Sequence, residues 1–321
     1  MPVLLTEGDV RSLLTMELAL EAVEESFRRL ADGAGLVQPR RRLNVPGKSY
    51  LHYMAAADSA AGYMGMKIYT TSRQGLRFLI PLFDANSGDS LALIEADYLG
   101  QIRTGAASGV ATKFLAREDA SRAGVIGTGS QAKTQLEAVA AVRKITEIRA
   151  YGRDAARREK FAEEMTARLG ARVMPVDSAE AAARGAAIVI TATTSTRPVL
   201  EGAWLAAGAH INAIGANFPQ KRELDDEAVR LCERIVVDSR EQSKMEAGDL
   251  IDTLRDDDSG WGRVLELSEI VAGKAKGRTG ADQITLFKSS GIASEDIAIA
   301  GRIYELARER RVGKQIDMWG E

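Results

Sequence analysis

The segment from Arg122 to Gln135, RAGVIGTGSQAKTQ, places two glycines one residue apart, after an apolar run and before a helical pattern. In a dinucleotide-binding loop the first glycine permits a tight turn and the second lets the backbone approach the pyrophosphate. A third small residue lets the helix pack on the strand. Gly127, Gly129 and Ala132 fill these places. Because free N–H groups at the helix start at Ser130 would hold phosphates, the segment predicts dinucleotide binding.

The segment AYGRDAARRE bears on which dinucleotide would fit. An acidic residue near the end of the second strand binds the adenosine ribose, whereas a basic residue there accommodates a 2'-phosphate. Arg153 suits NADP(H) and Asp154 suits NAD(H), and Gly152 occupies the place where the carboxylate is most often found. Asp154 is also suited to be the N-cap of the next helix. The sequence therefore leaves the choice between NAD(H) and NADP(H) open.

Three cations in the first part of the chain suit the carboxylate of a small amino or imino acid. Arginine binds a carboxylate with a planar fork and lysine with a point charge, and Arg41, Lys67 and Arg103 are the candidates. Lys67 lies in the strand-like GMKIY, where its ammonium points into a cleft or snorkels at the surface. Arg103 and Thr104 open an Ala-rich helix, whose N-terminus attracts anions, so Arg103 there needs a partner or solvent.

A further polar side chain follows an apolar strand in HINAIGANFPQKRELDD, residues 210–226. Ligands of open α/β sheets gather outside the carboxyl ends of the strands, and Asn217 lies just past such an end. Its amide would contact the nicotinamide or the substrate, or would only cap the loop before Pro219.

The elements that must position these residues follow two different patterns. Residues 14–33 have helical spacing, and strand-like pieces at 50–58, 62–71, 76–85 and 89–97 predict a mostly antiparallel sheet. Strands are then expected at 123–127, 146–152, 172–177, 187–193, 210–216 and 234–238, with helices at 130–143, 154–169 and 179–184. This alternation is typical of a parallel sheet covered on both faces. Residues 294–311 predict a helix long enough to return to the first domain.

We therefore predict an α/β chain with two domains. A Rossmann domain with a doubly wound parallel sheet is expected over residues 117–288. An α+β domain for substrate binding and dimerisation is expected from residues 1–116 and 289–321.

Composition excludes several classes of protein. The net charge of -2 with both signs scattered argues against a nucleic-acid partner, and no apolar run is long enough for a membrane partner. Acidic residues near the N-terminus do not fit a signal peptide, so we expect a cytoplasmic protein. Cys232 is the single cysteine, which excludes an intrachain disulfide, and with two histidines a metal site is not expected.

The motifs IRTGAASGVATKFLA, GVIGTGSQA, INAIGANFPQKRELD and FKSSGIASEDIAIA together resemble the ornithine cyclodeaminase and mu-crystallin family, in order over residues 14–312. The resemblance implies a homodimer whose N-terminal domains pair their sheets. It implies that Lys67, Arg103 and the arginine of QPRR best matched by Arg41 bind the substrate carboxylate. Along the cofactor it places Ser130, Gln131, Thr191, Ala192, Lys288, Ser289 and Gly291, to which we add Thr104 and Thr193.

One departure from this family bears on the reaction. Its cyclodeaminases carry an aspartate as general base where GAN stands here, and Asn217 cannot take a proton in the useful range. Reduction of a preformed imine needs only carboxylate binding, orientation of the nicotinamide, and a proton from Lys67 or water. We therefore predict an NAD(P)H-dependent reductase of small α-imino acids, such as pyrroline-2-carboxylate or iminosuccinate, with Lys67 as the catalytic residue. The alternatives are an ornithine cyclodeaminase, an alanine dehydrogenase, or a cofactor-bound protein without turnover.

Overall fold

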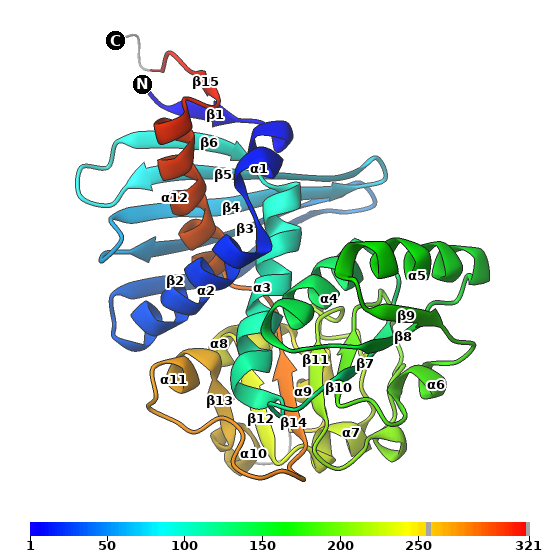
Figure 1. Ribbon diagram of the computed structural model, residues 1–321. Coiled ribbons are helices and arrows are strands. Elements are labelled where there is room, and N and C mark those ends of the chain that lie inside the picture. The colour runs from blue at the N-terminus through cyan, green and yellow to red at the C-terminus, as the bar shows by residue number, and fades with distance from the viewer. Residues whose placement is uncertain (255–257, 319–321) are drawn as a thin grey trace. The chain divides into compact units, whose positions relative to one another are not determined.

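The computed structural model describes residues 1–254 and 258–318, which form two compact units (Figure 1). The first unit consists of Met1–Arg103 and Gly291–Glu321, and the second of Thr104–Ser290. The chain passes from the first to the second inside helix α3 (Asp97–Leu115). The domain boundary that we predicted at residue 117 lies beyond this helix, because an Ala-rich helix shows no change of composition where its packing partners change.

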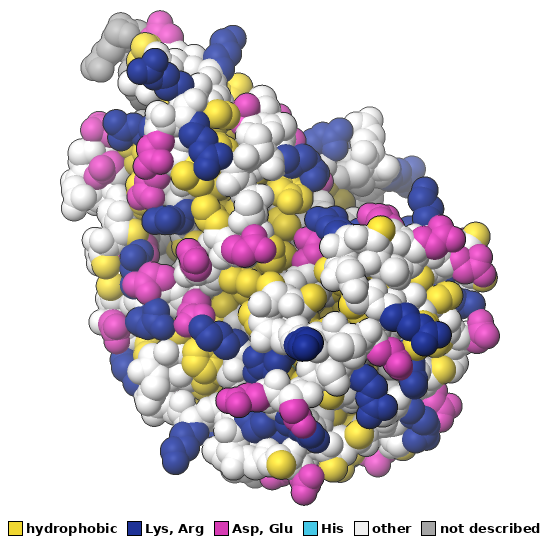
Figure 2. Space-filling model, in the orientation of Figure 1, with side chains coloured by type: hydrophobic (Ala, Val, Ile, Leu, Met, Phe, Trp, Pro, Cys, Tyr) yellow, Lys and Arg dark blue, Asp and Glu magenta, His cyan; other side chains and the backbone are white. Residues whose placement is uncertain are grey.

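Side chains of both charges are interspersed over the face shown in Figure 2. Within the described part of the chain, no helix is both long enough and apolar enough to cross a membrane.

The first unit is a seven-stranded sheet with helices, in the order β15-β1-β6-β5-β4-β3-β2. An antiparallel meander joins β2 (Gly35–Val45), β3 (Ser49–Asp58), β4 (Tyr63–Ser72), β5 (Gly75–Asp84) and β6 (Ser90–Glu95). The short β1 (Val3–Leu5) pairs with β6 and with β15 (Lys314–Gln315). Its helices are α1 (Glu7–Leu13), α2 (Met16–Ala31) and α12 (Ala293–Arg310), and α12 packs against β2 to β6. The predicted antiparallel sheet and last helix are confirmed, whereas β1, β2 and α1 were not predicted.

The second unit is an eight-stranded sheet in the order β13-β12-β14-β11-β10-β7-β8-β9, with parallel neighbours throughout. Its strands are β7 (Arg122–Ile126), β8 (Glu147–Tyr151), β9 (Arg172–Pro175), β10 (Ile188–Thr191), β11 (His210–Ala213), β12 (Arg234–Val237), β13 (Val264–Glu266) and β14 (Thr285–Lys288). Its helical segments are α4 (Ser130–Val142), α5 (Ala155–Leu169), α6 (Ala179–Ala183), η1 (Gly202–Trp204), α7 (Asp226–Leu231), α8 (Arg240–Glu246), α9 (Gly248–Ile251), α10 (Asp258–Gly262) and α11 (Leu267–Val271). The strands β7, β8 and β9 follow one another toward one edge of the sheet, and β10 then adds on the other side of β7, so the strand order reverses there. This is the strand arrangement of a Rossmann fold, so the predicted fold is confirmed.

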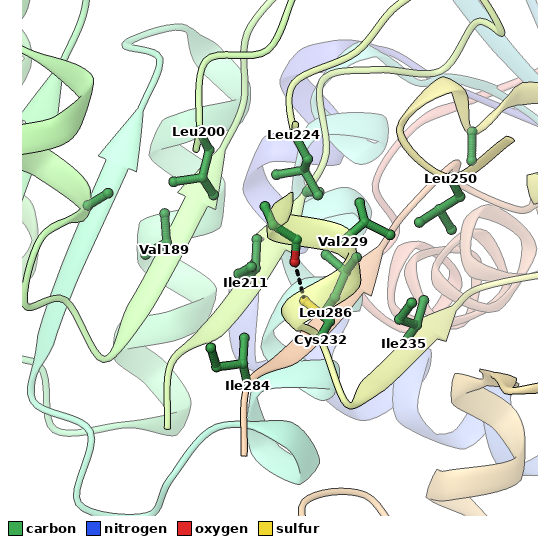
Figure 3. Close-up of a cluster of buried hydrophobic side chains, with 14 of the residues drawn as sticks. Val189, Leu200, Ile211, Leu224, Val229, Cys232, Ile235, Leu250, Ile284 and Leu286 are labelled. Carbon is green, nitrogen blue, oxygen red and sulfur yellow. Dashed lines mark hydrogen bonds between the residues drawn. The ribbon is translucent and has the colours of Figure 1, made fainter. Parts of the chain in front are cut away.

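Two apolar layers cover the parallel sheet, one on each face. Adjacent residues of one strand point to opposite faces, so Val125 packs with Leu136 and Phe161 while Ile126 belongs to the other layer. Figure 3 shows part of that second layer, where the Cys232 thiol donates a hydrogen bond of 3.0 Å to the carbonyl of Ala228. Burial raises the pKa of this thiol to about 12, so it stays protonated.

Candidate active site

Lys67 is buried in the first unit, on the face of β4 that α12 covers. Its Nζ lies 2.8 Å from Asp296 Oδ1 and 5.5 Å from the ring centroid of Phe78. A Cβ at Gly100 would lie 3.0 Å from this ammonium, so a glycine leaves the room that the lysine occupies. The ammonium of Lys67 is therefore buried among side chains of the first unit, which argues against the surface alternative.

Arg103 is held by two carboxylates from the first turn of α12. Its Nη1 donates to Glu295 Oε2 at 2.8 Å, and its Nε lies 3.3 Å from Asp296 Oδ1. Acidic residues are favourable at this end of a helix because of the helix dipole. Gly291 has a φ of 76°, and a Cβ there would lie 2.4 Å from Arg103 Nη1. The guanidinium is thus fixed from both sides.

Helix α3 begins earlier than the sequence indicated. It starts at Asp97, so Arg103 and Thr104 lie in its second turn rather than at its N-terminus. The Glu7 carboxylate accepts hydrogen bonds from the amides of Asp97 and Tyr98, and it caps this start from a distant part of the chain. Our argument that an anion at Arg103 would lie at a helix N-terminus is therefore wrong.

The third cation of this cluster is Arg40, not Arg41. The Arg40 side chain is buried, and its Nη2 donates to the Gly291 carbonyl at 3.1 Å and lies 3.7 Å from the sulfur of Met54. Arg41 is exposed, and it pairs across the strands with Tyr53. The pairing of β2 with β3 shifts between Gln38 and Arg41, so one extra residue there reverses which side chains face inward.

The charges of Lys67, Arg103, Arg40, Glu295 and Asp296 act on one another, and we call these five residues the cation cluster. Burial and the nearby Arg103 lower the pKa of Lys67 to about 8, although Asp296 opposes this shift. Lys67 therefore exchanges its proton near neutral pH, which an ordinary lysine does not do. A site with two guanidinium groups and an ammonium of this pKa can bind a carboxylate and deliver a proton.

His52 lies beside this cluster, on the same face of the sheet. Its ring stacks on Tyr69 with 4.2 Å between the ring centroids, and Nε2 lies 3.3 Å from Thr71 Oγ1. Burial and the positive charges of Arg42 and Arg40 lower the pKa of His52 to about 4. His52 is thus neutral near pH 7 and adds no charge to the cation cluster.

The glycine loop of the second unit lines a cleft of about 900 Å³. Gly127 has a φ of 116°, and a Cβ there would lie 2.3 Å from the Ala192 carbonyl. Gly129 is the N-cap of α4 and provides no side-chain cap, so the first amides of α4 lack that acceptor. Around the same cleft lie Thr128, Tyr151, Gly152, Arg153, Asp154, Arg157, Ala192, Thr193, Thr194, Ser195, Thr196 and Val199. This arrangement suits a dinucleotide pyrophosphate at a helix N-terminus.

A buried polar network at the carboxyl ends of β10, β11 and β14 was not predicted. The Glu223 carboxylate accepts from the amides of Thr193 at 2.6 Å and Gly215 at 2.7 Å, and from the Thr191 hydroxyl at 2.9 Å. Asp249 Oδ1 accepts from the Glu223 amide at 2.6 Å, and its Oδ2 lies 3.1 Å from Lys288 Nζ. Burial raises the pKa of Glu223. The network fixes the loops that follow these strands, and the loop after β10 lines the cleft.

The predicted cofactor residues separate into two groups. Gly127, Gly129, Arg153, Asp154, Ala192 and Thr193 line the cleft. Lys288 and Thr191 are fully buried in the polar network, and the Ser289 hydroxyl donates to Asp238 at 3.2 Å. Ser130 and Gln131 begin α4 beside the loop, whereas the side chains of Ala132 and Thr104 are buried. Gly291 belongs to the first unit, and Asn217 is half-buried beyond the end of β11.

Comparisons with known proteins show which family this chain is similar to. The model of the ornithine cyclodeaminase/mu-crystallin family matches residues 1–311. An alanine dehydrogenase from Archaeoglobus fulgidus is 38% identical and covers 98% of this chain and 97% of its own. A Delta(1)-pyrroline-2-carboxylate reductase from Thermococcus litoralis, solved with NADH and L-proline, is 39% identical with a TM-score of 0.93, over 98% of this chain and 100% of that one. An archaeal alanine dehydrogenase dimer with bound NAD is 36% identical with a TM-score of 0.93, over 99% of both chains.

Proposed function

Because the chain belongs to the ornithine cyclodeaminase/mu-crystallin family, we propose that it is an NAD(P)H-dependent reductase of small α-imino acids that forms amino acids. The observation that carries this proposal is the cation cluster around the buried Lys67, whose pKa is lowered to about 8. Similarity to a pyrroline-2-carboxylate reductase and to alanine dehydrogenases supports it, since all of these interconvert a C=N and a CH–N group.

The cation cluster would bind the carboxylate of the imino acid. Arg103 is fixed by Glu295 and Asp296, so its fork is preorganised before the substrate arrives. Arg40 adds a second guanidinium, anchored on the Gly291 carbonyl. We propose for Arg40 the role that the family resemblance implied for Arg41.

Lys67 would supply the proton that the imine nitrogen needs. The ammonium predominates below pH 8, and Asp296 holds its Nζ at 2.8 Å in a fixed direction. A donor whose pKa lies near the working pH transfers its proton most efficiently.

The residues of the second unit would hold a nicotinamide dinucleotide, which supplies the hydride when it is bound. The amides at the start of α4 would bind the pyrophosphate, and Gly127 and Gly129 let it approach the backbone. We therefore propose that the first unit binds substrate and the second unit binds the cofactor.

An alanine dehydrogenase is the second candidate, because a 38% identical relative carries that name and the chemistry is the same reaction on iminopropionate. A cyclodeaminase would need a base at Asn217, which an amide does not provide. A binding protein without turnover would have no use for a buried ammonium, whose desolvation opposes folding.

The test is loss of nicotinamide absorbance at fixed enzyme concentration. NADH and NADPH are each paired with pyrroline-2-carboxylate, and with pyruvate, glyoxylate or oxaloacetate in the presence of ammonia or methylamine. We expect oxidation with at least one imino acid. If none reacts while ornithine yields a cyclic product with catalytic NAD, the cyclodeaminase alternative replaces ours, and no reaction in any assay favours a binding protein.

We also propose a homodimer formed through the outer face of the first-unit sheet. Tyr53, Ile68 and Leu79 pair across β3, β4 and β5, and Tyr53 and Leu79 are 38% and 40% exposed on the face opposite Lys67. An apolar row of this kind is typical of a protein interface. A related alanine dehydrogenase is a dimer.

The homodimer is tested by light scattering. We expect twice the mass of one chain for the wild type and for Leu231→Asp, an exposed leucine of the second unit, and the monomer mass for Leu79→Asp. A monomeric wild type would refute the dimer. The cytoplasmic location stays a prediction, which cell fractionation would check.

A further inference from the structure

The residues after β8 line one part of the cofactor cleft, where a Rossmann fold binds the adenosine ribose of its cofactor. The choice between NADH and NADPH depends there on a carboxylate for the 2'-hydroxyl or a cation for a 2'-phosphate. This inference rests on the proposed function, because it concerns the same cofactor. The structure describes every residue of this wall, from Tyr151 to Arg158.

The position directly after β8 is closed to a carboxylate. It is occupied by Gly152, which is buried, and a Cβ there would lie 2.6 Å from Thr128 Oγ1 and 3.0 Å from Thr128 Cγ2. Both atoms belong to the glycine loop, so a longer side chain requires that loop residue to move. The side chain that usually binds the ribose diol is therefore missing for a steric reason.

The nearest carboxylate is engaged by the backbone. Asp154 is the N-cap of α5, and its Oδ1 accepts from the Arg157 amide at 2.9 Å. Turning this group toward a ribose would remove the cap, a loss of about 1 kcal/mol. Asp154 is thus the N-cap of α5, which is one of the two roles that the sequence left open for it.

Two cations line the cleft at the same place. Arg153 and Arg157 are exposed cleft residues, and among the residues that the structure describes neither guanidinium forms an ion pair. Arg158 differs, because it donates to Asp177 at 2.6 Å and to the Gly152 carbonyl at 3.0 Å and so fixes the wall. The ribose end of the cleft therefore offers two available positive charges and no available carboxylate.

We propose that Arg153 and Arg157 recognise a 2'-phosphate, so that this enzyme uses NADPH in preference to NADH. Arginine suits this task because its planar fork binds phosphate through two parallel hydrogen bonds. The compared structures contain NADH or NAD, so the cofactor that we propose here is a different one.

The test is calorimetric binding of NADPH, NADH, 2',5'-ADP and 5'-AMP to the full-length protein without substrate. We expect NADPH to bind more tightly than NADH, and 2',5'-ADP more tightly than 5'-AMP. In Arg153→Ala and Arg157→Ala the affinity for NADPH should fall about 10- to 100-fold, as expected for a lost charge-assisted hydrogen bond, with little change for NADH. Arg172→Ala removes an exposed arginine at the opposite end of a neighbouring strand and should change neither.

Each other outcome would overturn the preference. If NADH binds as tightly as NADPH, the preference is refuted and the proposed function is not affected. The same holds if the arginine variants lose affinity for NADH and for NADPH equally. If neither dinucleotide binds, the preference and the proposed function both fail. The combined variant Gly152→Asp/Thr128→Ala provides a second test, since it opens room for a carboxylate and should shift binding toward NADH.

Discussion

Replacing Lys67 with methionine tests the proposed chemistry at its centre. Methionine fills nearly the same volume as the lysine stem and removes only the ammonium, so no large cavity forms at this 2% exposed position. Asp296 loses a partner at 2.8 Å but keeps Arg103 Nε at 3.3 Å. The loss of stability should thus stay below the about 3–5 kcal/mol that an unpaired buried charge costs.

The kinetic effect should be much larger than the effect on folding. A general acid contributes about 10²- to 10⁴-fold to a rate. A charge-assisted hydrogen bond to the substrate carboxylate adds about 1.5–3 kcal/mol to transition-state binding. Together these predict that kcat/KM falls by at least about 10³-fold.

The assay is NAD(P)H oxidation under saturating cofactor, together with calorimetric cofactor binding and a thermal melt of the same samples. Cofactor affinity should not change, because the cleft is lined by residues of the second unit. Lys48→Met, at an exposed lysine in the turn between β2 and β3, is the matched control and should retain full activity. A folded Lys67→Met protein with more than about one tenth of the wild-type kcat/KM would refute the role of Lys67.

Three further predictions follow from the same structure. Because the pKa of Lys67 is about 8 and its protonated form donates, kcat/KM should be constant below pH 8 and fall above it. This decrease should be absent in Lys67→Arg, and an unchanged pH profile of that variant would assign the titration to another group. Arg40→Ala should raise KM for the imino acid about 10- to 100-fold whereas Arg41→Ala should not, and the reverse result in steady-state kinetics would restore Arg41 to the site. Glu223→Ala should lower the free energy of unfolding by about 2–6 kcal/mol in denaturant titrations, since two partly buried amides and the buried Thr191 hydroxyl lose their acceptor. The exposed-site variant Glu201→Ala should show no such loss.

Most of the fold could be predicted from local sequence patterns. The parallel sheet followed from short apolar strands alternating with amphipathic helices, and Gly127 and Gly129 marked the loop between the first strand and its helix. The sequence also made Lys67 and Arg103 candidates for carboxylate binding, although it left a surface position open for both. The start of α3 was not accessible in this way, since Glu7 caps it from about ninety residues away.

The features that we did not predict depend on contacts between segments that are remote in the sequence. Strict alternation inward from Val37 would place Arg41 inside, and only the bulge near Pro39 brings Arg40 there instead. Glu295 and Glu223 were missed because their partners are remote in sequence. The available signal was weak: Glu295 lies in a largely apolar segment, whereas the neighbours of Glu223 are mostly charged.

The most direct measurement of the proposed reaction follows the hydride itself. Nicotinamide cofactor deuterated at C4, in both stereochemical forms, is incubated with enzyme and pyrroline-2-carboxylate or iminopropionate, and the amino acid product is analysed by mass spectrometry. We predict one deuterium, attached to Cα, from one of the two forms. An amino acid product without deuterium from either form would contradict hydride transfer to the imine carbon.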